Sequence, residues 1–481
     1  MEINEIIQER INKLKTLSQK GINPYVNSFA PTASIGEVLN NFQEQKKVSL
    51  AGRITAKRLH GKAAFLDLKD QTGKIQAYVK EDFVGKEGYE IFGQLDLGDI
   101  VGLTGELFTT HTKEPTIKTQ DLVLLTKALR PLPEKWHGLK DVETRYRQRY
   151  LDLITNEEVK SVFVKRSLII SKIREILDKK GFLEVETPMM QEIPGGAAGR
   201  PFKTHHNEYD IDLFLRIAPE LYLKKLLVGG FQKVYEINRN FRNEGVSTRH
   251  NPEFTMLELY VAYSDCQGMM RLCQDLISQV AKDVLGTTKI NYLDKEINLE
   301  PPWQVISFAQ AVEDKFSIKP SDSSEEMLEK LHKKGRALGE KKLSRSQVVK
   351  MVEDILQENA SFSPTFFVDY FTILCPLAKK KQDNPLLSER FELFIGGMEV
   401  ANAYSELNDP IEQRARLQEE LAGGATDLKN IDEDFLLSLE QGMPPAGGLG
   451  IGIDRLIMIL TNQASIRDVI LFPQLKPIKN D

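Results

Sequence analysis

Several hallmarks of other protein classes are scarce or absent in this chain of 481 residues. Its three cysteines are too few for a disulfide framework, and their spacing matches no metal-binding motif. We therefore expect reduced thiols in a cytoplasmic protein. No apolar run approaches the ~20 residues that a membrane span requires, and the acidic, amphipathic N-terminus is unlike a secretory signal. Membrane and disulfide-rich secreted classes are thereby excluded, and no membrane partner is expected.

Two common nucleotide-binding motifs are also missing. The chain contains no G-x-x-x-x-G-K-[ST], which excludes a P-loop, and its glycine-rich segment Gly447–Arg455 does not match G-x-G-x-x-G. The net charge of −5 argues against a general nucleic-acid binder. Residues 1–150 are mildly basic, however, and the remainder is acidic, so we expect any RNA contact in the N-terminal part.

The composition is that of a globular protein with several domains. Hydrophobic residues make up 41% and charged residues 28% of the chain, and its length predicts about three domains. We divide it into an N-terminal helical extension (1–46), a β-rich domain (47–130), a proline-containing linker (131–155) and a large domain (156–481) with a helical insertion around 265–360. The predicted fold class is α+β.

Five short β-type runs in the second of these segments predict a small barrel, and the OB-fold is the commonest such barrel that binds nucleic acid. Turn signals such as Asp70-Gln-Thr-Gly separate them. The runs are Val48–Ile54, Ala64–Leu68, Lys74–Val79, Ile100–Gly105 and Asp121–Leu125.

A densely charged segment, Arg239–Glu258, lies between two hydrophobic runs that predict strands. It holds three arginines (Arg239, Arg242 and Arg249), a histidine and three glutamates. Because the planar guanidinium group matches phosphate oxygens, the segment predicts a triphosphate site. A solvated loop with surface ion pairs is the alternative.

Glycines alternate with apolar residues over Gly447–Gly452, which predicts a strand with one face free of side chains. Such a face allows the close approach of a flat ligand. Arg455 follows where a helix is expected to begin.

Earlier in the chain, an apolar stripe formed by Ile169, Ile173, Ile176 and Leu177 predicts a long helix that ends at Gly181. A strand from Phe182 to Pro188 is expected to follow it.

These motifs together resemble the class II aminoacyl-tRNA synthetases, and within them the lysyl-tRNA synthetases of bacterial type, over nearly the whole chain. The three class signatures correspond to Lys165–Pro188, to F-R-x-E at Phe241–Glu244 and to G-x-D-R at Gly452–Arg455. Four segments resemble lysyl enzymes in particular: Ile193–Ala198, Arg216–Lys224, Arg239–Gly245 and Gly396–Asn408. The resemblance implies an OB-fold anticodon-binding domain, followed by a catalytic domain in which helices flank an antiparallel sheet.

By the same resemblance, the chain is expected to attach L-lysine to tRNA(Lys) through a lysyl-adenylate, with ATP as co-substrate and Mg²⁺ as cofactor, and to act as a homodimer. Arg242 and Arg455 are the expected catalytic residues. The implied binding residues are Arg242, Glu244, His250, Asn251, Phe254 and Arg455 for ATP; Gly196, Glu220, Glu258, Tyr260, Asn402 and Glu406 for lysine; Glu392 and Glu399 for the metal; and Arg53, Phe65 and Gln76 for the anticodon.

Some of these assignments have alternatives. Phe65 could equally belong to the barrel core, and Glu114 is a weaker anticodon candidate. The acidic cluster Glu392, Glu399 and Glu406 could lie on an exposed strand pair, although its apolar context favours a site. The adjacent His205 and His206 predict no metal site.

Two other functions remain open for the whole chain. A lysyltransferase that modifies a protein would resemble the catalytic domain alone, whereas this chain also has the predicted barrel. An inactive RNA-binding relative would be expected to have lost Arg242, Glu244 or Arg455, and all three are present.

Overall fold

The computed structural model describes residues 3–60, 63–133, 139–197, 199–335, 343–357, 361–423 and 430–477. These fall into two compact units, Met1–Lys140 and Asp141–Asp481, each described here by itself. Parts of three expectations lie outside the described residues: residues 134–138 of the linker, residues 336–342 and 358–360 of the helical insertion, and Ala198 in the lysyl-type segment that begins at Ile193.

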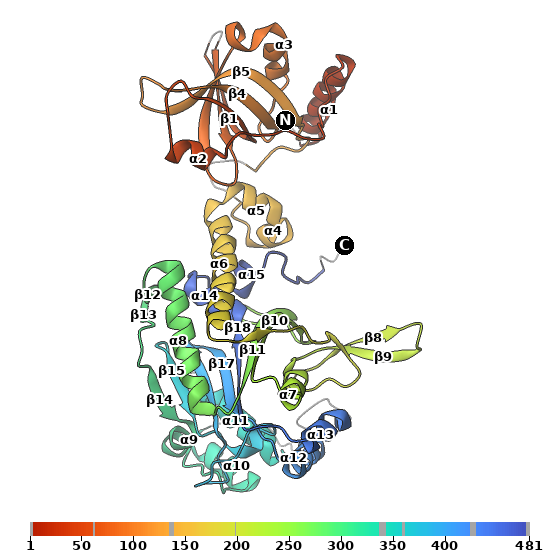
Figure 1. Cartoon of the computed structure of the whole chain (residues 1–481), viewed down its shortest axis with the longest axis vertical. Coiled ribbons are helices and arrows are strands. Elements are labelled where there is room, and N and C mark those ends of the chain that lie inside the picture. Colours follow the sequence, from red (N-terminus) through yellow and green to blue (C-terminus); the bar gives the residue numbers. More distant parts are fainter. Residues whose placement is uncertain are drawn as a thin grey trace. The chain divides into compact units, whose positions relative to one another are not determined.

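The N-terminal unit contains the predicted five-stranded barrel, which closes in the order β1-β2-β3-β5-β4 (Figure 1). Alternate residues such as Leu66 and Leu68 fill its interior, as the period of a strand requires. The last strand begins at Pro115, earlier than the sequence indicated, because it pairs with both β3 and β4. The elements are α1 (Ile3–Gln19), α2 (Ile35–Asn40), β1 (Lys47–His60), β2 (Ala63–Lys69), β3 (Lys74–Lys80), α3 (Glu81–Gly93), β4 (Ile100–Thr109) and β5 (Pro115–Thr126).

The C-terminal unit is built on an eight-stranded sheet in the order β14-β15-β16-β17-β18-β11-β10-β6. The pairs β14–β15 and β10–β6 are parallel and the five others are antiparallel, so the predicted antiparallel sheet is confirmed. The strands are β6 (Leu183–Glu184), β10 (Lys233–Phe241), β11 (Glu253–Ala262), β14 (Gln304–Ser307), β15 (Thr365–Val368), β16 (Arg390–Ile395), β17 (Met398–Ser405) and β18 (Ala446–Gly452).

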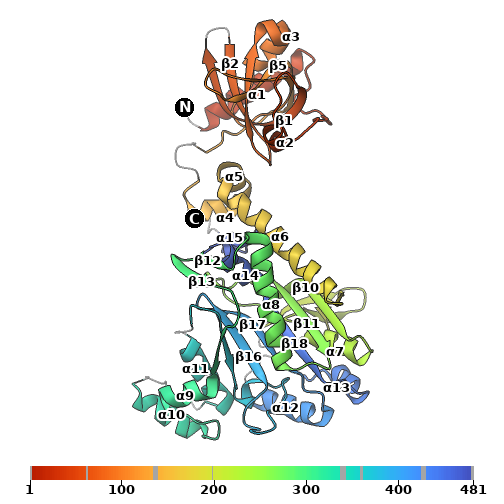
Figure 2. The ribbon, with the colours of Figure 1, turned by 60° about the vertical axis from the view of Figure 1, so that its left-hand side comes forward.

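The two faces of this sheet have different surroundings. One face packs against α8 (Cys266–Leu285) and α14 (Ile453–Leu460), and α6 (Glu157–Lys179) packs against both helices. Figure 2 shows α6 and α8 as long helices on this side of the unit. Since side chains alternate along a strand, the polar residues of the same strands point to the opposite face. The buried side of the central strands carries Leu257, Leu259, Phe391, Leu393, Ala401, Ala403, Leu449 and Ile451.

The long helix predicted from an apolar stripe is α6, whose Ile169, Ile173 and Leu177 are fully buried. Gly181 follows it with φ +80°, a left-handed conformation that glycine adopts without strain. The strand after it is only Leu183–Glu184, shorter than the sequence indicated, because it pairs with β10 at two positions.

The remaining elements surround this sheet. A separate three-stranded sheet, β7-β9-β8, includes a hairpin that projects from the unit in Figure 1. These elements are α4 (Val142–Arg147), α5 (Arg149–Thr155), β7 (Met190–Gln191), β8 (Phe202–His206), β9 (Ile211–Leu215), α7 (Glu220–Val228), β12 (Lys289–Tyr292), β13 (Lys295–Asn298), α9 (Phe308–Phe316), α10 (Ser324–Lys333), α11 (Arg345–Gln357), the 3-10 turn η1 (Thr372–Leu374), α12 (Pro410–Gly423), α13 (Glu433–Glu440) and α15 (Ile466–Val469).

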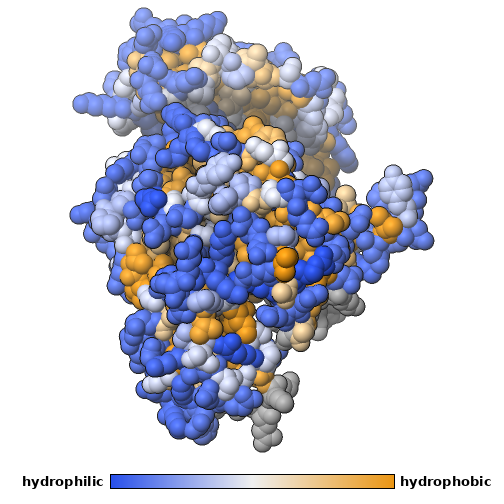
Figure 3. Space-filling view, turned by 60° about the horizontal axis from the view of Figure 1, so that its bottom comes forward, coloured by the Kyte–Doolittle hydropathy of each residue, from blue (hydrophilic) through white to orange (hydrophobic). Residues whose placement is uncertain are grey.

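The face of the molecule seen in Figure 3 is largely hydrophilic, and its hydrophobic residues form scattered patches rather than one broad area. Among the described residues, no helix is long and apolar enough to cross a membrane.

Candidate active site

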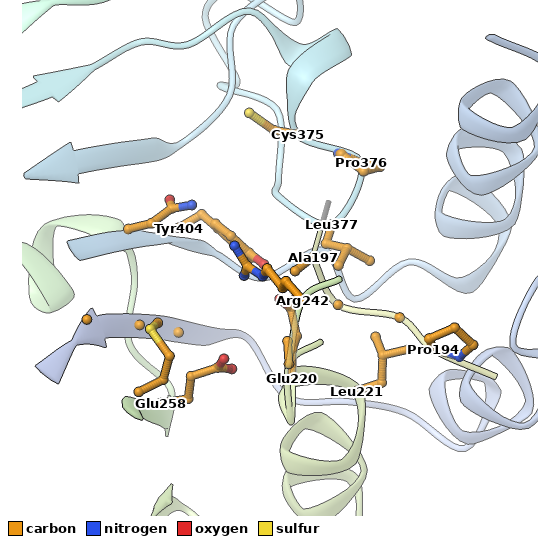
Figure 4. Close-up of a pocket in the computed structure, with 18 of the residues that line it drawn as sticks. Pro194, Ala197, Glu220, Leu221, Arg242, Glu258, Cys375, Pro376, Leu377 and Tyr404 are labelled. Carbon is orange, nitrogen blue, oxygen red and sulfur yellow. The ribbon is translucent and has the colours of Figure 1, made fainter. Parts of the chain in front are cut away.

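A cavity of about 460 Å³ lies over the open face of the large sheet. Its lining comes from the sheet, from the loop after β10, from the start of α7 and from the segment that precedes β16. In Figure 4 the side chains of Glu220, Arg242 and Tyr404 lie in the middle of this space. Every residue expected to bind ATP, lysine or the metal lines this one cavity.

The register of the strands explains why residues distant in sequence meet here. Glu258 of β11 is opposite Gly450 of β18, which is opposite Asn402 of β17, which is opposite Glu392 of β16. The neighbouring row on the same face runs Tyr260, Gly448, Tyr404 and Arg390. Two adjacent rows thus bring charged and aromatic side chains from four strands to one surface.

The glycines of β18 leave space for side chains on both faces of the sheet. A Cβ atom at Gly448 would lie 2.0 Å from Glu406 Oε1 and 2.5 Å from Tyr260 Cε1, so only glycine leaves room for those two side chains. Gly447 faces the other way, where a Cβ would lie 2.8 Å from Met269 of α8. Gly450 also lines the cavity, and a Cβ there would lie 3.3 Å from Met256 Cε and 3.7 Å from Glu258 Cγ.

Arg242 begins the charged loop between β10 and β11, the two strands that the sequence predicted. Its guanidinium carbon lies 5.1 Å from the centre of the Phe254 ring, and its Nε has no hydrogen-bond partner among the described residues. Burial lowers the pKa of Arg242, although Glu244 and Glu399 oppose that effect. A half-buried arginine whose Nε is itself buried and unused is suited to receive an anion.

Arg455 lies in the first turn of α14, which begins at Ile453. It donates hydrogen bonds to the backbone oxygen of Glu399 (2.7 Å) and to Nε2 of His250 (3.1 Å). The other ring nitrogen of His250 lies 2.9 Å from Ser247 Oγ. Burial and the charge of Arg455 lower the pKa of His250, which favours the neutral ring. The expected ATP residues on two elements are therefore directly linked.

Glu392, an expected metal ligand, belongs to a buried network. It accepts hydrogen bonds from Arg390 (2.5 Å), Tyr370 (2.8 Å) and Gln357 (2.9 Å). Burial raises its pKa to about 8, and nearby Glu399 contributes, while Arg390 opposes the shift. Each carboxylate oxygen has two lone pairs, so Oε1, which accepts only from Arg390, retains capacity for a cation. The pair Glu392 and Glu399 fits the one or two carboxylates that Mg²⁺ uses beside substrate phosphates.

The other end of the cavity holds three buried carboxylates, with exposed fractions of 5% for Glu220, 7% for Glu258 and 0% for Glu406. Tyr404 donates to Glu220 Oε1 at 2.5 Å, and Tyr260 OH lies 3.5 Å from Glu258 Oε2. Burial, with the charge of Glu220, raises the pKa of Glu258 to about 8. Such a concentration of buried negative charge predicts a cationic ligand.

Three other expected site residues line the cavity and also contact other residues of the protein. Gly196 has φ +85°, and a Cβ there would lie 2.8 Å from Glu220 Cβ. The Asn402 side chain accepts from Arg390 at 3.1 Å, and the Asn251 side chain donates to the Glu253 backbone oxygen at 2.6 Å. Glu244, the remaining ATP candidate, is exposed at the rim.

The anticodon candidates lie on the outer face of adjacent barrel strands. Phe65 is half-buried, lies outside the barrel core and packs 5.2 Å from Tyr78. Gln76 accepts a hydrogen bond from Thr116 and donates one to Glu114, the weaker candidate, which places that residue beside it. Arg53 donates to the backbone of Gly98 at 2.7 Å.

The histidine pair is separated by the alternation of β8. His205 lies 3.1 Å from Asp212, whereas His206 stacks on Tyr209 with ring centres 4.6 Å apart. Within the described parts of the chain, no group of three or more histidine, cysteine, aspartate or glutamate residues could hold a metal ion.

Sequence reasoning missed several residues in this cavity or directly behind its lining. Four of them contact the predicted carboxylates: Lys224, Arg390, Tyr370 and Tyr404. Asp454 joins α14 to Arg166 of α6 (2.6 Å). Only Lys224 carried a local signal, because it follows Glu220 by four residues, the spacing of a helical ion pair. The contacts of Arg390 and Tyr404 depend on strand register, and those of Tyr370 and Asp454 on the packing of segments distant in sequence.

Comparisons with known proteins agree with this geometry. The family model described as tRNA synthetases class II (D, K and N) matches residues 141–476, and the model described as OB-fold nucleic acid binding domain matches residues 48–125. A lysine–tRNA ligase of Carboxydothermus hydrogenoformans is 53% identical over 484 residues, 99% of each chain. One of Pelotomaculum thermopropionicum is 55% identical over 487 residues, 99% of this chain and 96% of its own.

Proposed function

Because this chain belongs to the class II tRNA synthetases of the D, K and N type, we propose that it attaches L-lysine to tRNA(Lys) through a lysyl-adenylate. One observation carries the choice of lysine: three buried carboxylates, Glu220, Glu258 and Glu406, close one end of the cavity. A site of this kind rejects neutral amino acids, because its own charge would be left unpaired.

The site residues then fall into two groups, one that binds lysine and one that binds ATP. Glu406, Glu258 and Tyr260 receive the side-chain ammonium of lysine, Gly196 and Glu220 its α-amino group, and Asn402 its carboxylate. ATP lies along the charged loop, and Phe254 and Arg455 stack on the two faces of adenine. Glu244, His250 and Asn251 hold the base and the phosphates. All of these residues line one cavity, which supports this assignment of binding roles.

In the first step, a carboxylate oxygen of lysine attacks the α-phosphorus of ATP. The bond from that phosphorus to the oxygen bridging the α- and β-phosphates breaks, and pyrophosphate leaves. Arg242 bridges the attacking carboxylate and the α-phosphate, and its buried, preorganised charge stabilises the transition state. Arg455 contacts the γ-phosphate.

In the second step, a terminal ribose hydroxyl of the tRNA attacks the adenylate carbonyl. The new ester forms as the bond to AMP breaks, and the hydroxyl proton is released. No cavity residue is assigned as a covalent nucleophile, so positioning and charge stabilisation account for the rate.

Glu392 and Glu399 would hold Mg²⁺ beside the phosphates. When bound, the ion neutralises charge on the phosphate oxygens. Arg390, Tyr370 and Gln357 hold the Glu392 carboxylate in place for that purpose.

The rest of the proposal concerns the whole chain. The barrel within 47–130 reads the anticodon, residues 1–46 extend it, 131–155 link it to the catalytic domain 156–481, and the insertion is around 265–360. A homodimer forms through the helix of the first signature, α6, on which Val164 and Leu168 expose apolar side chains. The activity takes place in the cytoplasm.

Aminoacylation with radiolabelled lysine and unfractionated bacterial tRNA tests this function. We expect lysine to become acid-precipitable only when both ATP and tRNA are present. Transfer of lysine to protein, with none to tRNA, would favour the alternative lysyltransferase.

Replacing Phe65 with alanine should weaken charging of tRNA but leave adenylate formation unchanged. Loss of a base stack costs about 1–3 kcal/mol, so we expect kcat/KM for tRNA to fall by about 5- to 150-fold. Leu59→Ala is the control, because Leu59 is an exposed apolar residue (65%) of the same barrel. Equal losses in charging and in ATP–pyrophosphate exchange would assign Phe65 a structural role.

Replacing Gly448 with alanine should raise the KM for lysine. The new Cβ would overlap Glu406 Oε1 and the Tyr260 ring, and such overpacking costs about 1–3 kcal/mol. We expect a KM increase of at least about fivefold in pyrophosphate exchange, with the KM for ATP little changed. Gly93→Ala is the control, because nothing lies within 4 Å of a Cβ there. An unchanged KM for lysine would contradict the assignment of Glu406 and Tyr260.

A further inference from the structure

The carboxylates at the closed end of the cavity already hold a cation, Lys224 of α7. Its side chain has no solvent exposure, and its Nζ lies 2.6 Å from Glu220 Oε1 and 2.5 Å from Glu406 Oε2. The rings of Tyr404 and Phe435 lie 5.4 Å and 5.9 Å from the same nitrogen. Lys224 is therefore enclosed by two carboxylates and two aromatic rings.

Most charged and titratable groups around Lys224 are acidic. Glu220 lies on α7 with it, Glu406 follows β17, Glu258 lies on β11, and Glu420 of α12 interacts with Glu220. The hydroxyl groups of Tyr404 and Tyr260 face the same space. Arg242 and Arg216 favour the charged form of Glu258. Among the described residues, Lys224 is the cation that forms ion pairs with Glu220 and Glu406.

The carboxylate of Glu406 needs its neighbour to remain charged. Burial, together with Glu220 and Glu258, raises the pKa of Glu406 to about 8, and Lys224 acts in the opposite direction. Burial by itself lowers the pKa of Lys224, but Glu220 and Glu406 outweigh it, so the ammonium remains protonated. Lys224 therefore favours the charged form of Glu406, whose pKa would be higher without it, and Glu406 favours the charged form of Lys224.

One oxygen of Glu406 remains available. Oε2 faces Lys224, whereas Oε1 has no hydrogen-bond partner among the described residues and lies in the space left by Gly448. A second ammonium group could therefore bind Glu406 without displacing the first. The chain would then place two ammonium groups, its own and the ligand's, on the two oxygens of one carboxylate.

We propose that Lys224 is a positioning residue that sets specificity: it orients the Glu406 carboxylate and favours its ionised form, so that Oε1 selects a substrate carrying a side-chain ammonium. The inference rests on the proposed function. It goes beyond that function by assigning the discrimination between lysine and a neutral amino acid to a resident cation that does not itself touch the substrate.

The variant Lys224→Met, which keeps the length of the side chain but removes its charge, tests this role. The pKa of Glu406, already raised to about 8, would then rise further, and a smaller fraction of the carboxyl groups would be ionised at neutral pH. We expect kcat/KM for lysine in pyrophosphate exchange to fall by at least about tenfold, mainly through KM, while the KM for ATP changes little. The preference for lysine over norleucine, which lacks only the ammonium, should fall in parallel.

The pH profile separates this role from a merely structural one. Glu406 has a pKa of about 8 in the unaltered protein and a higher one in Lys224→Met, so the deficit of the variant should be constant at lower pH and shrink as the pH rises above about 8. The free lysine ammonium stays protonated until about pH 10. Lys224→Arg, which restores a cation, should show a profile like that of the unaltered protein. Lys225→Met is the matched control, since Lys225 pairs with the exposed Asp434 and lies outside the cavity lining.

If Lys224→Met does not fold, Lys224→Gln, which is neutral but polar, should show the same shift in pH profile. A profile parallel to that of the unaltered protein, or equal losses in lysine and ATP affinity, would overturn the proposal. Failure of the unaltered protein to activate lysine would instead overturn the proposed function and leave the pairing of Lys224 and Glu406 unexplained.

Discussion

Glu406→Gln should abolish lysine-dependent ATP–pyrophosphate exchange. The change keeps the shape of the side chain but removes the fully buried charge that we assign to the substrate ammonium. Removing one partner of a buried, hydrogen-bonded charge pair costs about 3–5 kcal/mol, so the expected loss in kcat/KM for lysine is at least about 100-fold. ATP binding, measured by calorimetry, should be nearly unchanged because Glu406 lies away from the charged loop.

This variant needs a folding control, because Lys224 loses one of its two carboxylate partners. Its thermal unfolding should be compared with that of Glu419→Gln, a change at an exposed position of α12. Full lysine activation by folded Glu406→Gln would remove Glu406 from the lysine site. A loss of ATP binding as large as the loss of lysine activation would point to collapse of the cavity.

The second large effect is expected at Arg242. Arg242→Lys keeps the charge but replaces the planar fork with a single ammonium group, which cannot bridge two anions in the same geometry. Loss of one preorganised contact of this kind costs about 10²–10³ in kcat. Single-turnover formation of lysyl-adenylate should show the loss directly, whereas transfer from preformed adenylate to tRNA should be less affected.

Arg271→Lys is the matched control for Arg242, since Arg271 is an exposed residue of α8 outside the cavity lining. If Arg242→Lys raised KM but left kcat unchanged, Arg242 would bind the substrate without favouring the transition state. That outcome would contradict the bridging role.

Much of the fold was predictable because its signals are local. The alternation of the barrel strands, the apolar stripe of α6 and the glycine at its end all depend on residues within a few positions. Boundaries were less accurate where pairing decides them. The strand β5 extends back to Pro115 and β6 is only two residues long, and both limits depend on partners distant in sequence.

The candidate site was predictable in its residues but not in its connections. Arg242, Glu392 and Glu406 were chosen from motifs, and the structure brings them to one cavity, yet their roles remain predictions. The contacts of Arg390 and Tyr404 follow from the register of β16, β17 and β18, which one sequence does not specify. The need for glycine at position 448 is likewise explained only by its packing against Glu406 and Tyr260.

The most direct test of the central claim, that this cavity forms lysyl-adenylate, is ATP–pyrophosphate exchange with the purified protein and each of the twenty amino acids in turn. We predict strong exchange with lysine and at most weak exchange with the others, including arginine and methionine. Exchange driven best by aspartate or asparagine, or none with any amino acid, would contradict the account.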